Sequence, residues 1–158
     1  MPRVIVLDTF PLSSTAKREP PAGGAPTTLD QCQDWIKACV RAGNRVVAPA
    51  IAYYEALREL ERLNATSQIA RLRAFCHVAP DRYLPITDAD LDRAAVLWAR
   101  ARNAGTPTAG MEALDGDVIL AAQALGMGVP ASELVIATTN PAHLSQFVTA
   151  ALWTDIAP

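Results

Sequence analysis

Hydrophobic and polar positions follow one another in blocks that predict strands and helices in turn. Residues 3–8 (RVIVLD) form a continuous β-branched apolar run, which is typical of a strand buried on both faces of a parallel sheet. Residues 45–48 and 134–137 are shorter runs of the same kind. Elsewhere, apolar residues recur at helical spacing. We expect helices at 29–42, 49–64, 67–75, 87–103, 116–125 and just after Pro141. Short extended pieces are expected at 77–79 and 83–86, a loop of small residues at 104–109, and a final strand at 152–156.

Regular alternation of strands with helices predicts an α/β sandwich with a mainly parallel sheet. The chain of 158 residues fits one domain, 1–158, with a Pro/Gly-rich loop at about 13–28. Thr87 is a candidate helix N-cap with Asp90 three residues later. Asp115 stands just before the helix expected from residue 116, which is also an N-cap position.

Composition narrows the class of protein. Hydrophobic residues make up 51% and charged residues 19% of the chain, so it can bury a core and is not disordered by composition. No apolar stretch reaches the roughly 20 residues that span a bilayer, and the short apolar start lacks the features of a signal peptide, so we expect a cytoplasmic protein without a membrane segment. The three cysteines lack metal-site spacing and are expected to be reduced core thiols. A net charge of −2 predicts that any contact with nucleic acid uses local patches.

Polar residues directly follow two of the predicted strands. Asp8 and Thr9 follow the first strand, and Thr138, Thr139 and Asn140 follow the strand at 134–137. Ligands bind beyond the carboxyl ends of strands in open parallel sheets, so these side chains are expected at one edge. From position alone, Asp8 is as compatible with capping a turn as with binding a metal.

Two further acids lie inside otherwise apolar helices, Glu55 in IAYYEAL and Asp117 in LDGDVILAAQAL. A carboxylate buried without a partner is costly, so such acids need a cation, a donor or a proton. If Asp8, Glu55 and Asp117 converge, a divalent ion such as Mg²⁺ or Mn²⁺ relieves their repulsion and supports metal-assisted hydrolysis of a phosphodiester. Taken singly, Glu55 also fits a solvated helix face, and Asp117 a favourable helix N-terminus.

The order of these motifs resembles PIN-domain proteins of the VapC toxin type. The resemblance runs from VIVLDTFPLS nearly to the C-terminus, and DVILAAQAL followed by VIATTN is its most specific part. It implies a three-layer α/β/α sandwich and a Mg²⁺- or Mn²⁺-dependent endoribonuclease. It also implies that a cognate antitoxin blocks the toxin, and that the toxin forms a homodimer.

The resemblance also assigns site residues. The family's three acids fall on Asp8, Glu55 and Asp117, and its polar turn falls on residues 138–140, with Thr9, Thr139 and Asn140 expected around the metal. The family's fourth acid falls on His143, so that ligand is missing or replaced by Asn140 or Asp115. From the sequence, His143 and His77 are interpreted as surface or structural residues.

Other functions remain to be weighed. The missing fourth acid supports a PIN-like module that binds a partner or RNA without cutting it. An aspartyl phosphotransferase is disfavoured because Phe10 stands where such enzymes usually carry a second acid. A dinucleotide-binding fold is disfavoured because no glycine-rich turn follows the first strand. Arg58 and Arg62 can contact phosphates, but interleaved glutamates favour a solvated face of mixed charge.

Overall fold

A computed structural model describes residues 3–105 and 111–158, with only the backbone described at 111 and 112. Within these residues the strands form one sheet in the order β3-β2-β1-β4-β5, and every neighbouring pair is parallel. The strands are β1 (Val4–Leu7), β2 (Arg45–Pro49), β3 (Tyr83–Leu84), β4 (Leu134–Thr138) and β5 (Ala150–Leu152). The helices are α1 (Thr9–Ser14), α2 (Thr28–Arg41), α3 (Ala50–Arg62), α4 (Thr66–His77), α5 (Asp88–Asn103), α6 (Met111–Gly126) and α7 (Pro141–Leu144). The predicted parallel sheet is confirmed.

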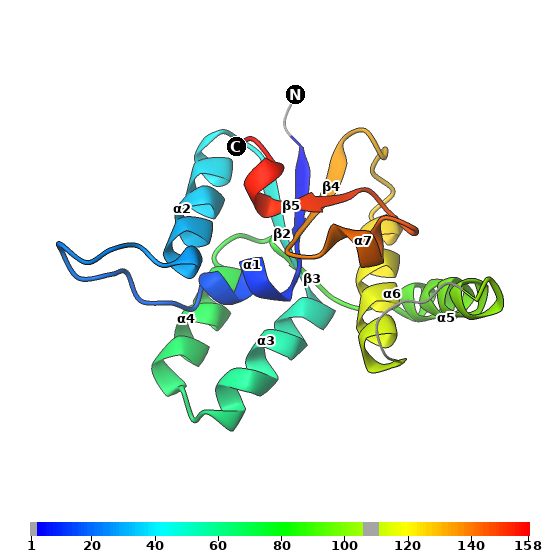
Figure 1. Cartoon of the computed structure of the whole chain (residues 1–158), viewed down its shortest axis with the longest axis horizontal. Coiled ribbons are helices and arrows are strands. Elements are labelled where there is room, and N and C mark those ends of the chain that lie inside the picture. The colour runs from blue at the N-terminus through cyan, green and yellow to red at the C-terminus, as the bar shows by residue number, and fades with distance from the viewer. Residues whose placement is uncertain (1–2, 106–110) are drawn as a thin grey trace.

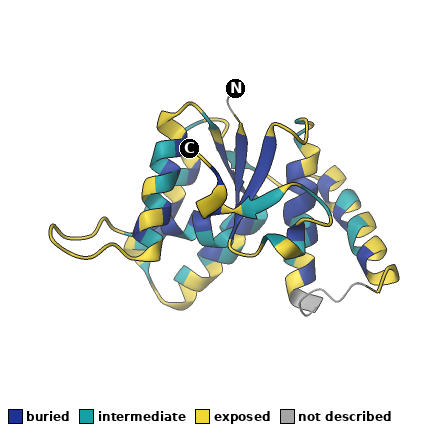
Figure 2. Ribbon diagram, turned by 45° about the horizontal axis from the view of Figure 1, so that its top comes forward, coloured by how far each residue is buried: buried dark blue, intermediate teal, exposed yellow. Residues whose placement is uncertain are grey.

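Side chains alternate between the two faces of β1, and all four of its residues are buried. Figure 2 shows that the central strands of the sheet are buried. Ile5 and Leu7 pack into a cluster with residues of α1, α2, α3 and α4, whereas Val4 and Val6 pack with residues of α6 and α7. Figure 1 shows α1 to α4 on one side of the sheet and α6 on the other, with α5 packed outside α6. A three-layer sandwich results, and a strand buried on both faces explains the continuous apolar run.

The capping box predicted at Thr87 is present. The Thr87 hydroxyl accepts a hydrogen bond from the Asp90 N–H, and the Asp90 carboxylate accepts one from the Thr87 N–H. Helix α5 begins at Asp88 as a result. Among the described residues no helix has the length and the apolar character to cross a membrane.

Four predicted boundaries were wrong. The loop begins later than expected, because helix α1 starts directly after Asp8 and ends at Ser14. The Asp8 side chain caps this helix. Pro11 is tolerated because it lies in the first turn, where the N–H groups have no helical partner. Helix α4 continues through residue 77, so residues 77–79 are not extended. The last strand is β5, followed by a 3₁₀ turn, Trp153–Asp155, that buries Trp153.

The fourth correction concerns α6, which begins at Met111 and not after Asp115. Asp115 is therefore an exposed residue within the helix and not its N-cap. Leu114 extends the apolar face of α6 by one turn, because it is buried in the cluster shared with α5. The small-residue loop expected at 104–109 lies mostly outside the described residues.

Candidate functional site

A cleft of about 980 Å³ lies at the carboxyl ends of the strands. Residues from four parts of the chain line it. They are Asp8, Thr9, Phe10 and Ser13 from the end of β1 and α1; Ile51, Tyr54, Glu55 and Arg58 from α3; Ala113, Asp115, Gly116, Asp117 and Ile119 from α6; and Thr139 and His143 from the segment after β4. All three acids predicted to bind a metal share this cleft.

Asp8 is oriented by hydrogen bonds to both of its carboxylate oxygens. The Thr9 N–H donates to Oδ1 over 2.7 Å, and the Thr138 hydroxyl donates to Oδ2 over 2.6 Å. Thr138 is buried at the end of β4, which pairs with β1, so the sheet register brings the two residues together. Each carboxylate oxygen keeps a second lone pair, so Asp8 can still bind a cation.

Glu55 is linked to Asp8 through Thr9. The Thr9 hydroxyl donates to Glu55 Oε2, so one threonine contacts both acids. Glu55 also lies against the backbone of α6, because a Cβ placed on Gly116 would be 2.5 Å from Glu55 Oε1. Glycine is disfavoured in a helix interior by about 1 kcal/mol relative to alanine, and here it leaves the space that the Glu55 carboxylate occupies.

Asp117 shows that the negative charges interact. Burial raises the pKa of its carboxyl from 3.8 to about 6, and the neighbouring charges of Asp8 and Glu55 also raise it. His143 acts to lower the pKa of Asp117, and its Nδ1 lies 3.7 Å from Asp117 Oδ2. The deprotonated cleft therefore holds negative charge that a cation would compensate.

Of the three polar residues predicted around the metal, two line the cleft and one does not. Thr9 lies between two of the acids, and Thr139 lines the cleft. Asn140 is exposed; its backbone N–H donates to the Thr138 hydroxyl, and its side-chain nitrogen lies 3.3 Å from the His143 ring. Among residues 138–140, the side chain that contacts Asp8 is thus that of Thr138.

His143, interpreted from the sequence as a surface or structural residue, lines the cleft. Helix α7, which carries His143, packs against α6, and this places the ring beside Asp117. The other histidine, His77, is exposed at the end of α4 and packs on Tyr83.

Sequence reasoning missed Gln123, a buried glutamine on α6. Its Oε1 accepts a hydrogen bond from the Ile51 N–H at the start of α3, over 3.2 Å, and its Nε2 donates to the Leu84 carbonyl over 2.9 Å. This side chain ties the start of α3, the helix of Glu55, to α6, the helix of Asp117. The signal in the sequence was a single amide within the apolar run ILAAQAL, since buried polar groups need hydrogen-bond partners.

The donors in the cleft suit a hard divalent cation. Among the side chains that the structure describes, no group of three His, Cys, Asp or Glu residues is already arranged to hold a metal ion. Mg²⁺ usually keeps several waters and binds one or two carboxylates directly, so it does not require a complete protein cage. Asp8, Glu55 and Asp117 therefore fit such an ion in chemistry, charge and location.

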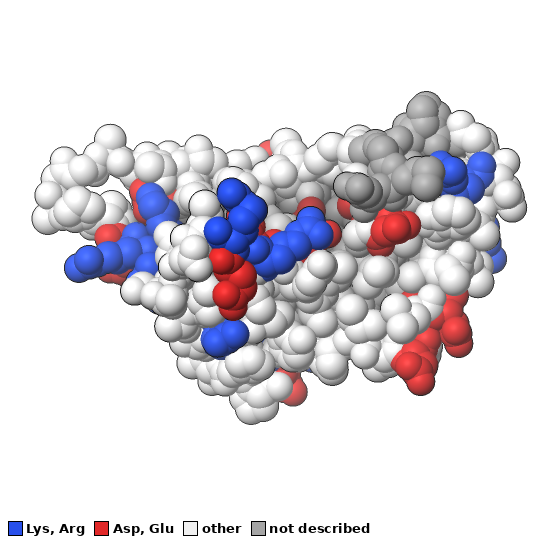
Figure 3. All heavy atoms as spheres, turned by 90° about the horizontal axis from the view of Figure 1, so that it is seen from below, with Lys and Arg blue, Asp and Glu red and all other residues white. Residues whose placement is uncertain are grey.

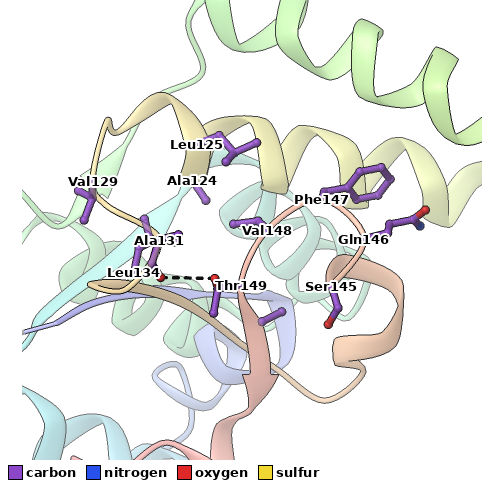
Figure 4. Close-up of a pocket in the computed structure, with 11 residues that line it drawn as sticks. Ala124, Leu125, Val129, Ala131, Leu134, Ser145, Gln146, Phe147, Val148 and Thr149 are labelled. Atoms are coloured by element: carbon purple, nitrogen blue, oxygen red, sulfur yellow. Dashed lines mark hydrogen bonds between the residues drawn. The ribbon is translucent and has the colours of Figure 1, made fainter.

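A second hollow, of about 520 Å³, lies at the other end of the sheet. It is lined by Ala124 and Leu125 of α6 and by residues near the starts of β4 and β5, including Leu134, Val148 and Thr149 (Figure 4). None of the described residues that line it is charged, and one hydrogen bond, from the Thr149 hydroxyl to the Ala131 carbonyl, crosses it.

Comparisons with known proteins give likenesses of fold. No protein-family model matches the sequence, and no curated protein matches it significantly. A chain in the crystal structure of FitAcB from Neisseria gonorrhoeae is 19% identical, with a TM-score of 0.65 over 96% of this chain and 99% of that chain. A chain in VapBC-1 from nontypeable Haemophilus influenzae is 17% identical, with a TM-score of 0.65 over the same shares.

A chain of VapBC2 from Rickettsia felis, bound to a DNA fragment from their promoter, is 12% identical, with a TM-score of 0.66 over 95% of this chain and 98% of that chain. At these low sequence identities, the comparisons show similarity of fold alone. Together with the parallel sheet and its two helical layers, they show that the chain has the PIN-like α/β/α sandwich fold.

Proposed function

We propose that the protein is a divalent-metal-dependent endoribonuclease and the toxin of a toxin–antitoxin pair. One observation carries the proposal: Asp8, Glu55 and Asp117, far apart in the sequence, share one cleft, where burial and the charges of the first two raise the pKa of the third. Mutual repulsion of this kind is removed when the acids bind Mg²⁺ or Mn²⁺. RNA as the substrate rests on the resemblance of the motifs to VapC-type PIN domains.

The chain's own residues would prepare the site. Asp8, Glu55 and Asp117 would hold the ion, while Thr9 and Thr138 fix the orientation of Asp8 through two hydrogen bonds. The ion would supply a Lewis acid that activates water and neutralises charge on a phosphodiester. His143 lies beside Asp117, with its Nδ1 3.7 Å from Asp117 Oδ2.

The proposed partners follow from the resemblance and the similar structures. Those structures are VapBC and FitAcB assemblies, and one is bound to promoter DNA. We therefore propose a cognate antitoxin that covers the cleft, a homodimer of this chain, and a cytoplasmic location where RNA is available.

The direct test is RNA cleavage by the purified protein with Mg²⁺ or Mn²⁺, compared with Asp8→Asn. Asparagine is as good an N-cap as aspartate, so this change removes the charge while keeping the cap of α1. Cleavage should disappear in the variant and in the presence of a chelator. Asp81→Asn, at an exposed position outside the cleft, is the matched control and should cleave normally. Equal cleavage by Asp8→Asn would exclude this site.

A second candidate is a PIN-like module that binds without cutting. His143 at the position of the family's fourth acid, and the lack of a ready-made metal cage among the described side chains, favour it. Mn²⁺ separates the two candidates, because an ion that binds the native state raises Tm. Unchanged Tm in millimolar Mn²⁺, together with RNA binding, would support the module.

A further inference from the structure

Two side chains of α3 stand beside Glu55 at the cleft. Tyr54 and Arg58 both line it, one helical turn apart, and the Arg58 guanidinium carbon lies 5.4 Å from the centre of the Tyr54 ring. Tyr54 is 56% exposed, although large aromatic side chains usually bury most of their surface. An exposed aromatic ring and a cation are therefore placed next to a proposed metal ligand.

Arg58 differs from its neighbours on the same helix. Arg62, one turn further along, is paired with Glu59, whereas among the described residues Arg58 forms no close ion pair. The hydrogen bond from Arg62 is the main cause that lowers the pKa of Glu59, and the charge of Arg58 makes a smaller contribution. Arg58 is also the only lysine or arginine among the described residues that line the cleft. Figure 3, which views the molecule from below Figure 1, shows basic and acidic side chains interspersed on that face. A polyanion that approaches these acids therefore has Arg58 as its nearby counter-charge.

Tyr54 can contact a nucleic-acid base, whereas Arg58 can contact a phosphate. Aromatic side chains that bind single-stranded nucleic acid stack on bases, and they tolerate different bases because each has a π-face. A base paired within a duplex is stacked on its neighbours and cannot lie on a protein side chain without being unstacked. An exposed tyrosine at the mouth of the cleft thus fits an unpaired base.

We infer that Tyr54 and Arg58 form the substrate-binding platform of this cleft, in which an unpaired base stacks on Tyr54 and an adjacent phosphate binds Arg58. This inference rests on the proposed function. It makes α3 a two-part element, with Glu55 facing the reacting phosphodiester and the platform positioning the strand that carries it. Neither residue touches the reacting atoms, so both are positioning residues.

The competing explanation is local. Residues four apart on a helix contact one another, and such pairs add a few tenths of a kcal/mol to helix stability. If that were their whole role, Tyr54→Ala and Arg58→Ala would shift Tm slightly and leave the affinity for RNA unchanged. Binding measurements therefore separate the two explanations.

The test is fluorescence anisotropy with a labelled single-stranded oligoribonucleotide of mixed sequence, with Ca²⁺ in place of Mg²⁺ to prevent cleavage. Tyr54→Ala should weaken binding about 5- to 150-fold, and Tyr54→Phe should restore it, since one stacked base contributes about 1–3 kcal/mol. Arg58→Ala should weaken binding and lower the slope of log affinity against log salt by about 0.7, the value for one phosphate contact of a single strand. Arg58→Lys should keep the slope.

The matched control is Arg62→Ala, which removes the same charge from the same helix outside the cleft. It should bind RNA nearly as well as the wild type, and the annealed duplex should not respond to Tyr54→Ala. Equal losses in Arg58→Ala and Arg62→Ala, unchanged binding by Tyr54→Ala, or no binding by the wild type would each overturn the inference. Cleavage with Mg²⁺, measured in parallel, tests the proposed function separately: a platform without cleavage would refute only the nuclease, and cleavage indifferent to both residues would refute only the platform.

Discussion

Removing the charge of Asp117 should stabilise the metal-free protein. Its carboxyl is largely buried, with a side chain 21% exposed, and lies near Asp8 and Glu55. Asp117→Asn keeps the shape of the side chain and removes both the desolvation of the charge and the repulsion. If Asp117 serves the proposed metal site, it is thus expected to weaken the fold in the absence of metal.

The pKa of Asp117 determines how much stability the Asp117→Asn variant should gain. A rise from 3.8 to about 6 is about two pH units, which corresponds to about 3 kcal/mol at most. The asparagine amide still has to be buried, so we expect a gain of about 1–3 kcal/mol, or a rise in Tm of several degrees. A carboxyl with a higher pKa in the folded protein destabilises it only when deprotonated. The advantage of the variant should therefore be absent below about pH 4, grow up to about pH 6, and stay constant above it.

The assay is thermal and urea unfolding in a chelator, from about pH 4 to about pH 8, followed by the same series with Mg²⁺. The wild type should gain Tm on addition of Mg²⁺ and Asp117→Asn should not. Asp81→Asn, exposed and outside the cleft, should track the wild type throughout. A variant less stable than the wild type in chelator at neutral pH, or an advantage that does not vary with pH, would refute this account of the cleft.

Three other substitutions test the supports of the site. Gly116→Ala should fold normally, gain up to about 1 kcal/mol from helix propensity, and bind Mn²⁺ more weakly in titration calorimetry, because the new methyl group displaces Glu55. Thr138→Val should lower the cleavage rate about 10- to 100-fold, the usual cost of losing a hydrogen bond to a metal ligand, because Asp8 loses one of its two donors. Gln123→Leu should lower the free energy of unfolding by about 2–4 kcal/mol, measured in urea, because it leaves two backbone groups unpaired.

Each of these results has a contrary outcome. Unchanged Mn²⁺ affinity in Gly116→Ala would mean that Glu55 does not contact the ion. Normal cleavage by Thr138→Val would mean that Asp8 does not need its second hydrogen bond. For Gln123→Leu the control is Gln31→Leu, at an exposed position on α2, which should change stability by no more than about 0.5 kcal/mol; equal effects would show that the contacts of Gln123 are unimportant.

The sequence was most informative where local pattern and global fold agree. The run at 3–8 is apolar because β1 is buried on both faces, and Asp8 ends it because the strand ends there. The order of strands and helices predicts the parallel sheet, since crossover connections are needed between parallel strands. Because parallel strands end at the same edge, the order of elements was enough to bring Asp8 together with the residues that follow β4.

Features that depend on packing between helices could not be read from the sequence. Arg58 and Arg62 look alike in the chain, and only the direction of α3 places the first in the cleft. His143 lies beside Asp117 because α7 packs on α6. Helix α1 was not predicted from the sequence, because Pro11 disfavours helix everywhere except in a first turn, and the start of that turn was not evident.

The central claim is that one divalent ion binds where Asp8, Glu55 and Asp117 meet. A crystal soaked in Mn²⁺ tests it most directly, through an anomalous difference map recorded at the manganese edge. The account predicts one strong peak in the cleft, in contact with at least two of these carboxylates and lost in crystals of Asp8→Asn. A fully soaked crystal with no peak in the cleft, or with its manganese bound elsewhere, would contradict it.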